Sequence, residues 1–245
     1  MAIAIMALAG CGADKNLKKG EKYLAIGEYY DAATQFKQAY SKTATKDKAK
    51  RGEIALKIAL CNERINATQK AMAAYANAIR YGKATAADRL AYGRQLLKNG
   101  SYKQAEEQFR AVLDSIDNGS YPKPDKKDAA TQFDTNAART LAKNGLTSAM
   151  DAPKWKQQGS RYQVKRMDVF NSRRDDYSPT LAGDQYEHLY FTSTRNDAQG
   201  GELSGITGTK PADIFVSEKD DKGRWSKPEA VTGGLNTDFD EGACA

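Results

Sequence analysis

The stretch "GEKYLAIGEYYDAATQFKQA" (residues 20–39) recurs twice in the first half of the chain, as "ALCNERINATQKAMAAYANA" (59–78) and "GRQLLKNGSYKQAEEQFRAV" (93–112). The copies align without gaps and share a small residue, a turn residue, an alanine, an aromatic ring and a second small or branched residue. Such repeats are typical of stacked helical units, each of which buries its apolar face against the next. The shared positions hold Gly20, Gly27, Ala32, Phe36 and Ala39, then Ala59, Asn66, Ala71, Tyr75 and Ala78, and then Gly93, Gly100, Ala105, Phe109 and Val112.

This pattern resembles the tetratricopeptide repeat, a pair of antiparallel helices with a period of about 34 residues. The second and third copies are 34 residues apart, and the first and second are 39 apart, with "TATKD" (43–47) placed to hold the extra loop. The resemblance implies that the small residues let helices approach closely and that the turn residue ends each first helix in a left-handed conformation. It also implies that the aromatic residues fill the gaps between units, and Tyr23 belongs to the same packing set. The family's early tryptophan and late proline are absent from these copies.

Residues 14–150 are therefore expected to form a tetratricopeptide-type α-solenoid. The region is rich in Ala, Lys, Gln and Leu and shows helical periodicity. Pro122 and Pro124 interrupt the pattern, and "DAATQFDTNAARTLAKNGLTSAM" (128–150) then predicts a helix or helix pair that caps the last apolar face. The alternative is a generic amphipathic helical bundle, which the in-register copies disfavour.

Charge is divided unevenly along the chain, whose formal net charge is +7. Residues 12–150 carry 25 Lys plus Arg against 15 Asp plus Glu, whereas residues 151–245 carry 13 against 16. Basicity therefore belongs to the predicted solenoid. In an exported protein this charge indicates an acidic protein surface or an anionic envelope polymer as partner, or else a plain solvated face, and nucleic acid is not expected.

The second half follows a different pattern, with "DAPKWKQQGS" (151–160) expected as the linker. Beyond it, short apolar or aromatic runs alternate with turn residues, which predicts an all-β array of short strands over residues 161–245. The runs are "RYQVKRMDVF" (161–170), "EHLYFTSTR" (187–195), "ADIFVSEK" (212–219) and "RWSKPEAV" (224–231). The predicted fold class is therefore α plus all-β, in more than one domain.

The order of these runs resembles a WD-type blade of the TolB-like β-propellers. Ser178-Pro179 would enter the blade, residues 189–193 would form a buried strand, and residues 213–215 would open the next one. Propellers need four to eight blades of about 40–45 residues. Residues 161–245 are thus expected to hold the first blade and the entry of another, as part of a partial propeller. The chain would then be the N-terminal part of a longer protein.

"LAGC" (residues 8–11) follows a short apolar run and matches the lipobox of bacterial lipoproteins. In such proteins the cysteine, here Cys11, carries the acyl chains that anchor the mature N-terminus, and more than one chain gives stable anchoring. Residues 1–11 are then signal and lipobox, although no Lys or Arg precedes the apolar run. Gly12 stands where an aspartate would retain a lipoprotein at the inner membrane, which indicates the periplasmic face of the outer membrane. The alternative is a chance cysteine near the terminus.

A lipobox, tetratricopeptide repeats and this kind of blade in one chain resemble the Bacteroidetes outer-membrane lipoproteins associated with the type IX secretion system. In that family an OmpA-like peptidoglycan-binding domain follows the propeller. The resemblance implies a non-enzymatic, lipid-anchored periplasmic scaffold that binds other envelope or secretion proteins, with peptidoglycan contacted only through that further domain. Two alternatives stay open: a glycan- or peptide-binding accessory module, and the non-catalytic N-terminal part of a larger envelope enzyme.

No residue pattern predicts catalysis or a cofactor. The single histidine, His188, lies at the start of an apolar run without a nucleophile elbow nearby. Cys61 lies among apolar helix residues and is expected to be a small buried side chain. "GGELSGITG" (200–208) lacks the Lys-Ser/Thr ending of a phosphate-binding loop.

No metal site is predicted either. Cys11, Cys61 and Cys244 are far apart in the sequence, so converging thiol ligands for zinc are not expected. "NTDFDEG" (236–242) places Asn, Asp and Asp at alternating positions, as calcium loops do, but its glycine falls one position late. The segment is therefore not counted as a metal site.

Overall fold

The computed structural model describes residues 3–121 and 134–242, with the side chains of residues 3–11 left aside. The chain divides into two compact units, Met1–Ser160 and Arg161–Ala245. The first is helical, and the second is built around a small antiparallel sheet. A helical part therefore precedes a β part, as the sequence predicts, and each is described below by itself.

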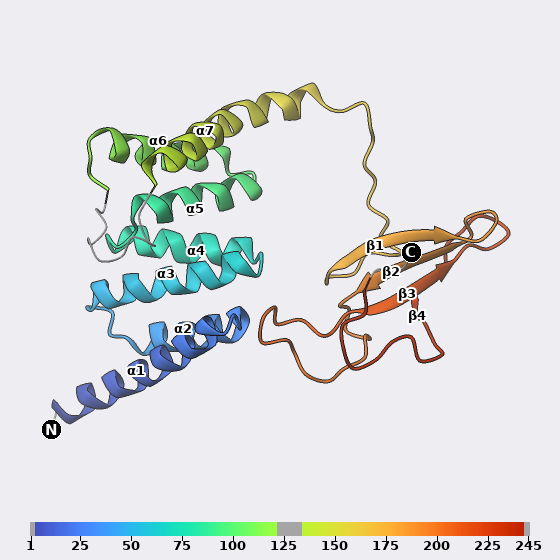
Figure 1. The fold of residues 1–245 in the computed structure, drawn as a ribbon, viewed down its shortest axis with the longest axis horizontal. Helices are drawn as coiled ribbons and strands as arrows, with labels where there is room; N and C mark the ends of the chain where they lie inside the picture. Colours follow the sequence, from blue (N-terminus) through green and yellow to red (C-terminus); the bar gives the residue numbers. More distant parts are fainter. Residues whose placement is uncertain (1–2, 122–133, 243–245) are drawn as a thin grey trace. The chain divides into compact units, whose positions relative to one another are not determined.

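The described part of the first unit contains seven α-helices, which lie in successive layers (Figure 1). Helix α1 packs on α2, α3 on α4 and α5 on α6, while contacts of α2 with α3 and of α4 with α5 join consecutive pairs. This arrangement is a TPR-like helical repeat. The helices are α1 (Ile3–Ala25), α2 (Tyr29–Lys42), α3 (Lys48–Arg64), α4 (Thr68–Arg80), α5 (Ala86–Lys98), α6 (Tyr102–Asp117) and α7 (Thr135–Gln158).

Each of the three helix pairs turns through a residue in the left-handed conformation. The φ angles are 82° at Gly27, 56° at Asn66 and 75° at Gly100. In the first pair the amide of Glu28 donates to the Tyr23 carbonyl at 3.0 Å, and the same contact recurs in the other two at 2.8 and 2.9 Å. These bonds satisfy carbonyls that the helix end leaves unpaired. The turn residues of the repeat thus stop each first helix at the same place.

Aromatic rings on the second helix of a pair lie directly against glycines of the first. A Cβ atom added to Gly20 would lie 2.6 Å from the Phe36 ring, and one added to Gly93 would lie 2.7 Å from the Phe109 ring. Both rings are fully buried. The Phe109 ring also lies against Gly145 of α7, so α5 and α7 enclose it from two sides. The absence of a side chain at these glycines is what admits the rings.

Helix α7 extends further than the sequence analysis expects, and most of the predicted linker at 151–160 is helical. The helix continues through Pro153 to Gln158 and ends at Gly159, whose φ is 72°. Proline removes one backbone donor, but the Lys, Trp and Gln residues after it tolerate the helix, and a glycine then terminates it. The linker prediction for residues 151–158 is corrected accordingly.

The second unit contains a four-stranded antiparallel sheet in the order β1-β2-β3-β4 (Figure 1). Each strand pairs with the next along the chain, which makes the sheet a meander. The strands are β1 (Asp176–Ala182), β2 (His188–Ser193), β3 (Asp213–Glu218) and β4 (Glu229–Ala230). The described residues form these strands and no closed propeller.

Two of the runs expected as strands are largely irregular. "RYQVKRMDVF" (161–170) forms no strand, and its Val164 is 97% exposed. The run at 224–231 contributes only β4 and a single bridge from Trp225 to Lys219. Pro228 precedes β4 and has no amide to donate to a ladder, which limits pairing there. In this half of the chain, the pattern of alternating apolar residues therefore predicts longer strands than the structure contains.

The core of the sheet is small and aromatic. Phe191 of β2 pairs with Phe215 of β3, their ring centroids are 6.2 Å apart, and Ala198 completes the buried cluster. Phe170, in the segment before β1, contacts the Phe191 ring at 6.5 Å and the Trp225 ring edge-on at 5.3 Å. Aromatic contacts therefore connect the entry segment to the sheet.

Candidate functional site

The repeat positions lie mainly inside the helical unit. Gly20 and Gly93 are buried, Tyr75 is 3% exposed, Tyr23 and Gly27 are half-buried, and Gly100 lies at an exposed turn. The buried residues among these set the spacing of the helices and are not available as a binding surface. The fully buried members are Ala32, Phe36, Ala39, Ala59, Ala71, Ala78, Ala105, Phe109 and Val112.

In the second helix pair the aromatic residue also makes a polar contact. The Tyr75 hydroxyl donates to Glu63 Oε2 at 2.6 Å, and Arg94 Nη2 donates to Glu63 Oε1 at 2.9 Å. Burial, with a further contribution from the bond to Glu63, raises the pKa of the Tyr75 phenol. The Glu63 carboxylate on α3 thus connects α4 and α5.

Ion pairs join the first helices of successive units. Exposed pairs of this kind contribute little to stability, but they neutralise acidic side chains on α1 and α3. The pairs are Lys50–Asp14 at 2.6 Å, Lys57–Glu21 at 3.2 Å and Arg94–Glu63 at 2.9 Å.

A groove of about 400 Å³ crosses α2, α3 and α4. Alanines line much of it, so the helices leave room for a side chain from outside. Tyrosine and asparagine side chains add hydroxyl and amide groups that can form hydrogen bonds. The lining residues are Tyr30, Ala33, Thr34, Lys37, Tyr40, Ala55, Ile58, Asn62, Ile65, Lys70, Ala73, Ala74 and Asn77.

The groove is positively charged. Neither aspartate nor glutamate lines it, whereas Lys37 of α2 and Lys70 of α4 do, and both lysines are exposed. Within residues 3–121 and 134–242, neither lysine takes part in an ion pair. An apolar floor beside two unpaired cations complements a segment that carries both apolar and acidic side chains.

Cys61 and His188 occupy structural positions. Cys61 is fully buried, and burial raises the pKa of its thiol to about 11, so the thiolate is disfavoured. His188 begins β2, with ring nitrogens 3.9 Å from Glu187 and 3.6 Å from Glu218. Neither arrangement is that of a nucleophile activated by an adjacent base.

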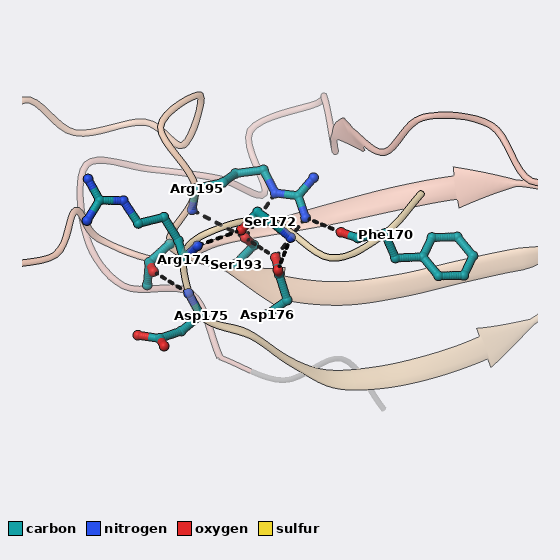
Figure 2. A network of polar contacts seen from close by, with 8 residues as sticks. Phe170, Ser172, Arg174, Asp175, Asp176, Ser193 and Arg195 are labelled. Atoms are coloured by element: carbon teal, nitrogen blue, oxygen red, sulfur yellow. Dashed lines mark hydrogen bonds and ion pairs between the residues drawn. The ribbon is translucent and has the colours of Figure 1, made fainter. Parts of the chain in front are cut away.

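A buried polar network ties the end of β2 to the turn before β1 (Figure 2). Arg195 Nη2 donates to Asp176 Oδ1 at 2.7 Å and to the Phe170 carbonyl at 2.8 Å. The Ser193 hydroxyl donates to Asp176 Oδ1 at 2.6 Å. The backbone amide of Ser172 donates to Asp176 Oδ2 at 2.5 Å. Asp176 is thus held by a guanidinium, a hydroxyl and an amide.

Arg195 and Asp176 form a buried ion pair, with side chains 9% and 10% exposed. The Arg195 guanidinium lies 4.9 Å from the Phe191 ring centre and 4.6 Å from that of Phe215, so it also contacts the aromatic core. Burial by itself would raise the pKa of Asp176, but the hydrogen bonds from Ser193, the Ser172 amide and Arg195 outweigh it, and the pKa is lowered. The network therefore connects the end of β2 to the start of β1 and to the segment before it.

The segment with calcium-like spacing is committed to backbone contacts. Asn236 Oδ1 accepts the Ile214 amide at 2.8 Å, and Asp240 Oδ1 accepts the Ala212 amide at 2.8 Å. Across residues 3–121 and 134–242, no three His, Cys, Asp or Glu side chains are grouped to bind a metal ion. The side chains of Asn236 and Asp240 therefore hold the segment against the start of β3.

The predicted lipidation site lies outside these observations. The side chains of Cys11 and of Cys244 are not among the described residues, although α1 includes residue 11 in its backbone. No helix in the described part of the chain is long and apolar enough to cross a membrane. The lipid anchor therefore stays a prediction.

Sequence reasoning missed both the groove and the arginine network. Lys37 and Lys70 fall at different positions of the repeat, so the alignment of the copies carries no signal for them. Arg195 follows an apolar strand, where an arginine is ordinarily exposed. A buried partner for it could have been sought in the acidic pair Asp175-Asp176, where β1 begins, but Asp176 is 19 residues away in the sequence.

Comparison with known proteins finds a likeness among solved structures and none among family models or curated proteins. No protein-family model matches the sequence, and no curated protein matches it either. Among solved structures, the Sgt2 TPR domain from Aspergillus fumigatus is similar, with 17% sequence identity and a TM-score of 0.41. That comparison covers 66% of this chain and 91% of the fungal domain. The description of the helices as a repeat rests on their pairing, their turns and their buried positions.

Proposed function

We propose that this protein is a non-enzymatic scaffold whose helical unit binds a segment of another protein in the groove across α2, α3 and α4. The observation that carries the proposal is the groove itself, an apolar floor with two lysines and no acidic side chain in its lining. Paired helices hold this surface in place, so a partner segment meets a preformed site.

The partner segment is expected to be acidic and partly apolar. Its carboxylates would lie near Lys37 and Lys70, and an apolar side chain would cover the alanines between α2 and α4. Charge complementarity at such a rim increases the rate of association and selects among partners, and burial of the apolar side chain adds affinity. Binding would therefore weaken as the salt concentration rises.

Site-specific photocrosslinking in the native host tests this assignment. A photoreactive amino acid at Ala73, exposed in the groove, should give a crosslinked product, whereas the same group at Gln69, exposed on the same helix outside the groove, should not. Charge reversal by Lys37→Glu with Lys70→Glu should remove the product at Ala73. Equal crosslinking from both positions, or a product that survives charge reversal, would place the partner elsewhere.

We further propose that Cys11 anchors this scaffold to the periplasmic face of the outer membrane. The support is the sequence Leu8-Ala9-Gly10-Cys11 and the requirement of lipoproteins for several acyl chains on one cysteine. The full-length protein should incorporate labelled palmitate in its host and partition into detergent, and Cys11→Ala should abolish both. Cys61→Ala is the matched control and should leave the label in place. An unlabelled, soluble wild-type protein would refute the anchor.

We also propose that the sheet is the first blade of a β-propeller and that the scaffold serves protein secretion of the type IX kind. A four-stranded antiparallel meander is the form a propeller blade takes, which supports the first part. The second part rests on the combination of lipobox, helical repeats and blade in one chain. Loss of secreted substrates from the culture medium after deletion of the gene would test it.

A further inference from the structure

The turn before β1 has a counterpart in the last described residues. The sequences are "NSRRDD" (171–176) and "NTDFDE" (236–241), which align as Asn, a hydroxyl residue, two variable residues and two acids. In the first turn the Ser172 amide donates to Asp176 Oδ2 at 2.5 Å, and the Arg174 amide donates to Ser172 Oγ at 3.0 Å.

The second turn repeats this hydrogen-bond pattern residue by residue. The Thr237 amide donates to Glu241 Oε1 at 3.1 Å, and the Phe239 amide donates to Thr237 Oγ1 at 3.1 Å. In both turns the side-chain oxygen of a hydroxyl residue therefore accepts a hydrogen bond from the backbone amide two residues later. The backbone amide of the same hydroxyl residue donates to the carboxylate four residues later. Asp176 and Glu241 are equivalent acidic positions of the same structural element.

The two carboxylates differ in what occupies their second oxygen. Asp176 Oδ1 accepts from Arg195 Nη2 at 2.7 Å and from Ser193 Oγ at 2.6 Å (Figure 2). Glu241 Oε2 is buried and has no hydrogen-bond partner in the described part of the chain. A buried carboxylate oxygen without a donor is costly. The second turn thus has a carboxylate acceptor like that of the first turn, but no arginine donates to it as Arg195 donates to Asp176.

A second carboxylate lies beside that vacant acceptor. Asp213, at the start of β3, is 0% exposed, its Oδ2 accepts the Gln199 amide at 2.6 Å, and its Oδ1 has no partner among the described residues. The Glu241 amide donates to the Ala212 carbonyl at 2.7 Å, which fixes Glu241 next to the start of this strand. Burial first, and then the charge and the direct side-chain contact of Glu241, raise the pKa of Asp213, against the opposing effects of the Gln199 amide and of Lys210. Two carboxylates therefore lie side by side, and within residues 3–121 and 134–242 neither forms an ion pair with a lysine or arginine.

We propose that Asp213 and Glu241 bind the guanidinium group of an arginine that is presented, as Arg195 is, by a β-segment with the Ser-x-Arg sequence. A guanidinium carries five donors in one plane and can bond to two carboxylates at once. Ammonium lacks this planar geometry. The site would therefore attach the sheet to another β-segment that carries the same Ser-x-Arg sequence as residues 193–195.

The surroundings of the site fit such a segment. Leu235 occupies the position that Phe170 holds in the first turn, where the carbonyl accepts from Arg195 and the ring covers the aromatic core. Leu235 is 49% exposed and Phe239 is 79% exposed, so apolar side chains flank the acceptor. An arriving strand would cover them while its arginine pairs with the acids.

Nuclear magnetic resonance on the full chain tests the proposal with a synthetic peptide of the sequence Phe-Thr-Ser-Thr-Arg-Asn, copied from residues 191–196. The amide signals of Gln199 and Thr237 report on the two carboxylates because these amides donate to them. Both signals should shift to saturation with the arginine peptide and stay unchanged with a peptide that carries neutral citrulline instead. Glu241→Gln should weaken binding roughly tenfold or more, since a charged hydrogen-bond partner is lost. The exposed control Glu202→Gln should not.

Each other outcome overturns the proposal. Equal shifts with the citrulline peptide would mean that no guanidinium is recognised. Shifts with calcium chloride but not with the peptide would make the pair a cation site, and shifts with pH alone would make it a shared-proton pair. Unshifted Gln199 and Thr237 signals with every probe would leave the carboxylates without a ligand. Undisturbed signals from the helical unit and from Arg195 establish that a variant that fails to bind is still folded.

Discussion

At the scale of single residues, the helical unit depends on alanines where helices cross. Ala71 of α4 is 0% exposed and packs in one cluster with Ala59 and Tyr75. Ala71→Leu should lower the free energy of unfolding by about 1–3 kcal/mol, because the added methyl groups must displace packed neighbours. Urea denaturation followed by circular dichroism measures this. Ala73→Leu, exposed on the same helix, should stay within about 0.5 kcal/mol, and an equal effect of both would contradict the packing.

The arginine network makes a second prediction at this scale. Arg195→Gln leaves Asp176 as an unpaired carboxylate in a site where its side chain is 10% exposed. Breaking a buried ion pair from one side typically costs about 3–5 kcal/mol. The sheet should therefore melt earlier, as followed by Trp225 fluorescence in a Trp155→Phe background that removes the signal of the helical unit. Arg224→Gln, which removes an ion pair on the surface, should change nothing measurable. A sheet equally stable without Arg195 would contradict the network.

Acid should weaken the ion pair between Arg195 and Asp176. The folded-state pKa of Asp176 lies below its unfolded value, so its ionised form contributes stability above the unfolded pKa, and that contribution is lost as the pH falls through the folded pKa. The stability difference between the wild type and Arg195→Gln should therefore shrink on acidification below the ordinary range of aspartate. A difference that is constant with pH, in melting curves recorded across that window, would mean that Asp176 does not titrate with the pair.

Residues differ in how readily their roles can be predicted from sequence. Alanines such as Ala32 and Ala105 could be predicted as interior positions because they recur at one spacing next to an aromatic ring. Arg195 and Asp213 could not, because a charged side chain is ordinarily exposed and its burial depends on a partner brought in by the fold. Predicting these buried charges requires knowing which residues the tertiary fold brings together, and a local sequence pattern does not show this.

At the scale of elements, α7 closes the helical stack by covering the Phe109 ring. A Cβ atom at Gly145 would overlap that ring. Gly145→Ala should therefore destabilise the unit by about 1–3 kcal/mol by overpacking, although the same change in an open helix gains up to about 1 kcal/mol. Thermal denaturation followed by far-ultraviolet circular dichroism shows whether the substitution lowers or raises the stability. Gly201→Ala, which meets nothing within 4 Å, should be neutral, and a gain in stability for Gly145→Ala would show that α7 does not enclose the ring.

Elements were predictable where periodicity and turn chemistry agree. The three helix pairs follow both a helical spacing and a left-handed turn residue, and the structure has them. The end of α7 was not predictable, because Pro153 signals a break that the following helix formers override. Residues 161–170 alternate like a strand, but no neighbouring strand pairs with them in the described structure.

At the scale of the whole molecule, the two units should differ in how well they fold alone. Residues 12–160 carry several buried clusters that link all the helices, and should give a cooperative helical melt when produced separately. The described residues of 161–245 bury a small cluster of Phe191, Ala198 and Phe215 and expose Val164 and Phe239, so this half should be sensitive to protease. Limited proteolysis and circular dichroism of the two halves compare them. A protease-resistant second half with a cooperative β melt would instead identify a self-sufficient domain.

The central claim is that the helical unit recognises an acidic, partly apolar protein segment in the groove across α2, α3 and α4. Its most direct measurement is selection of a random peptide library displayed on phage against the full chain, with the Lys37→Glu, Lys70→Glu variant selected in parallel. The account predicts enrichment of peptides that combine Asp or Glu with a large apolar residue on the wild type, and loss of that set on the variant, because the groove lining then repels carboxylates. Enrichment of the same acidic peptides on both proteins, or of peptides without acidic residues on the wild type, would contradict it.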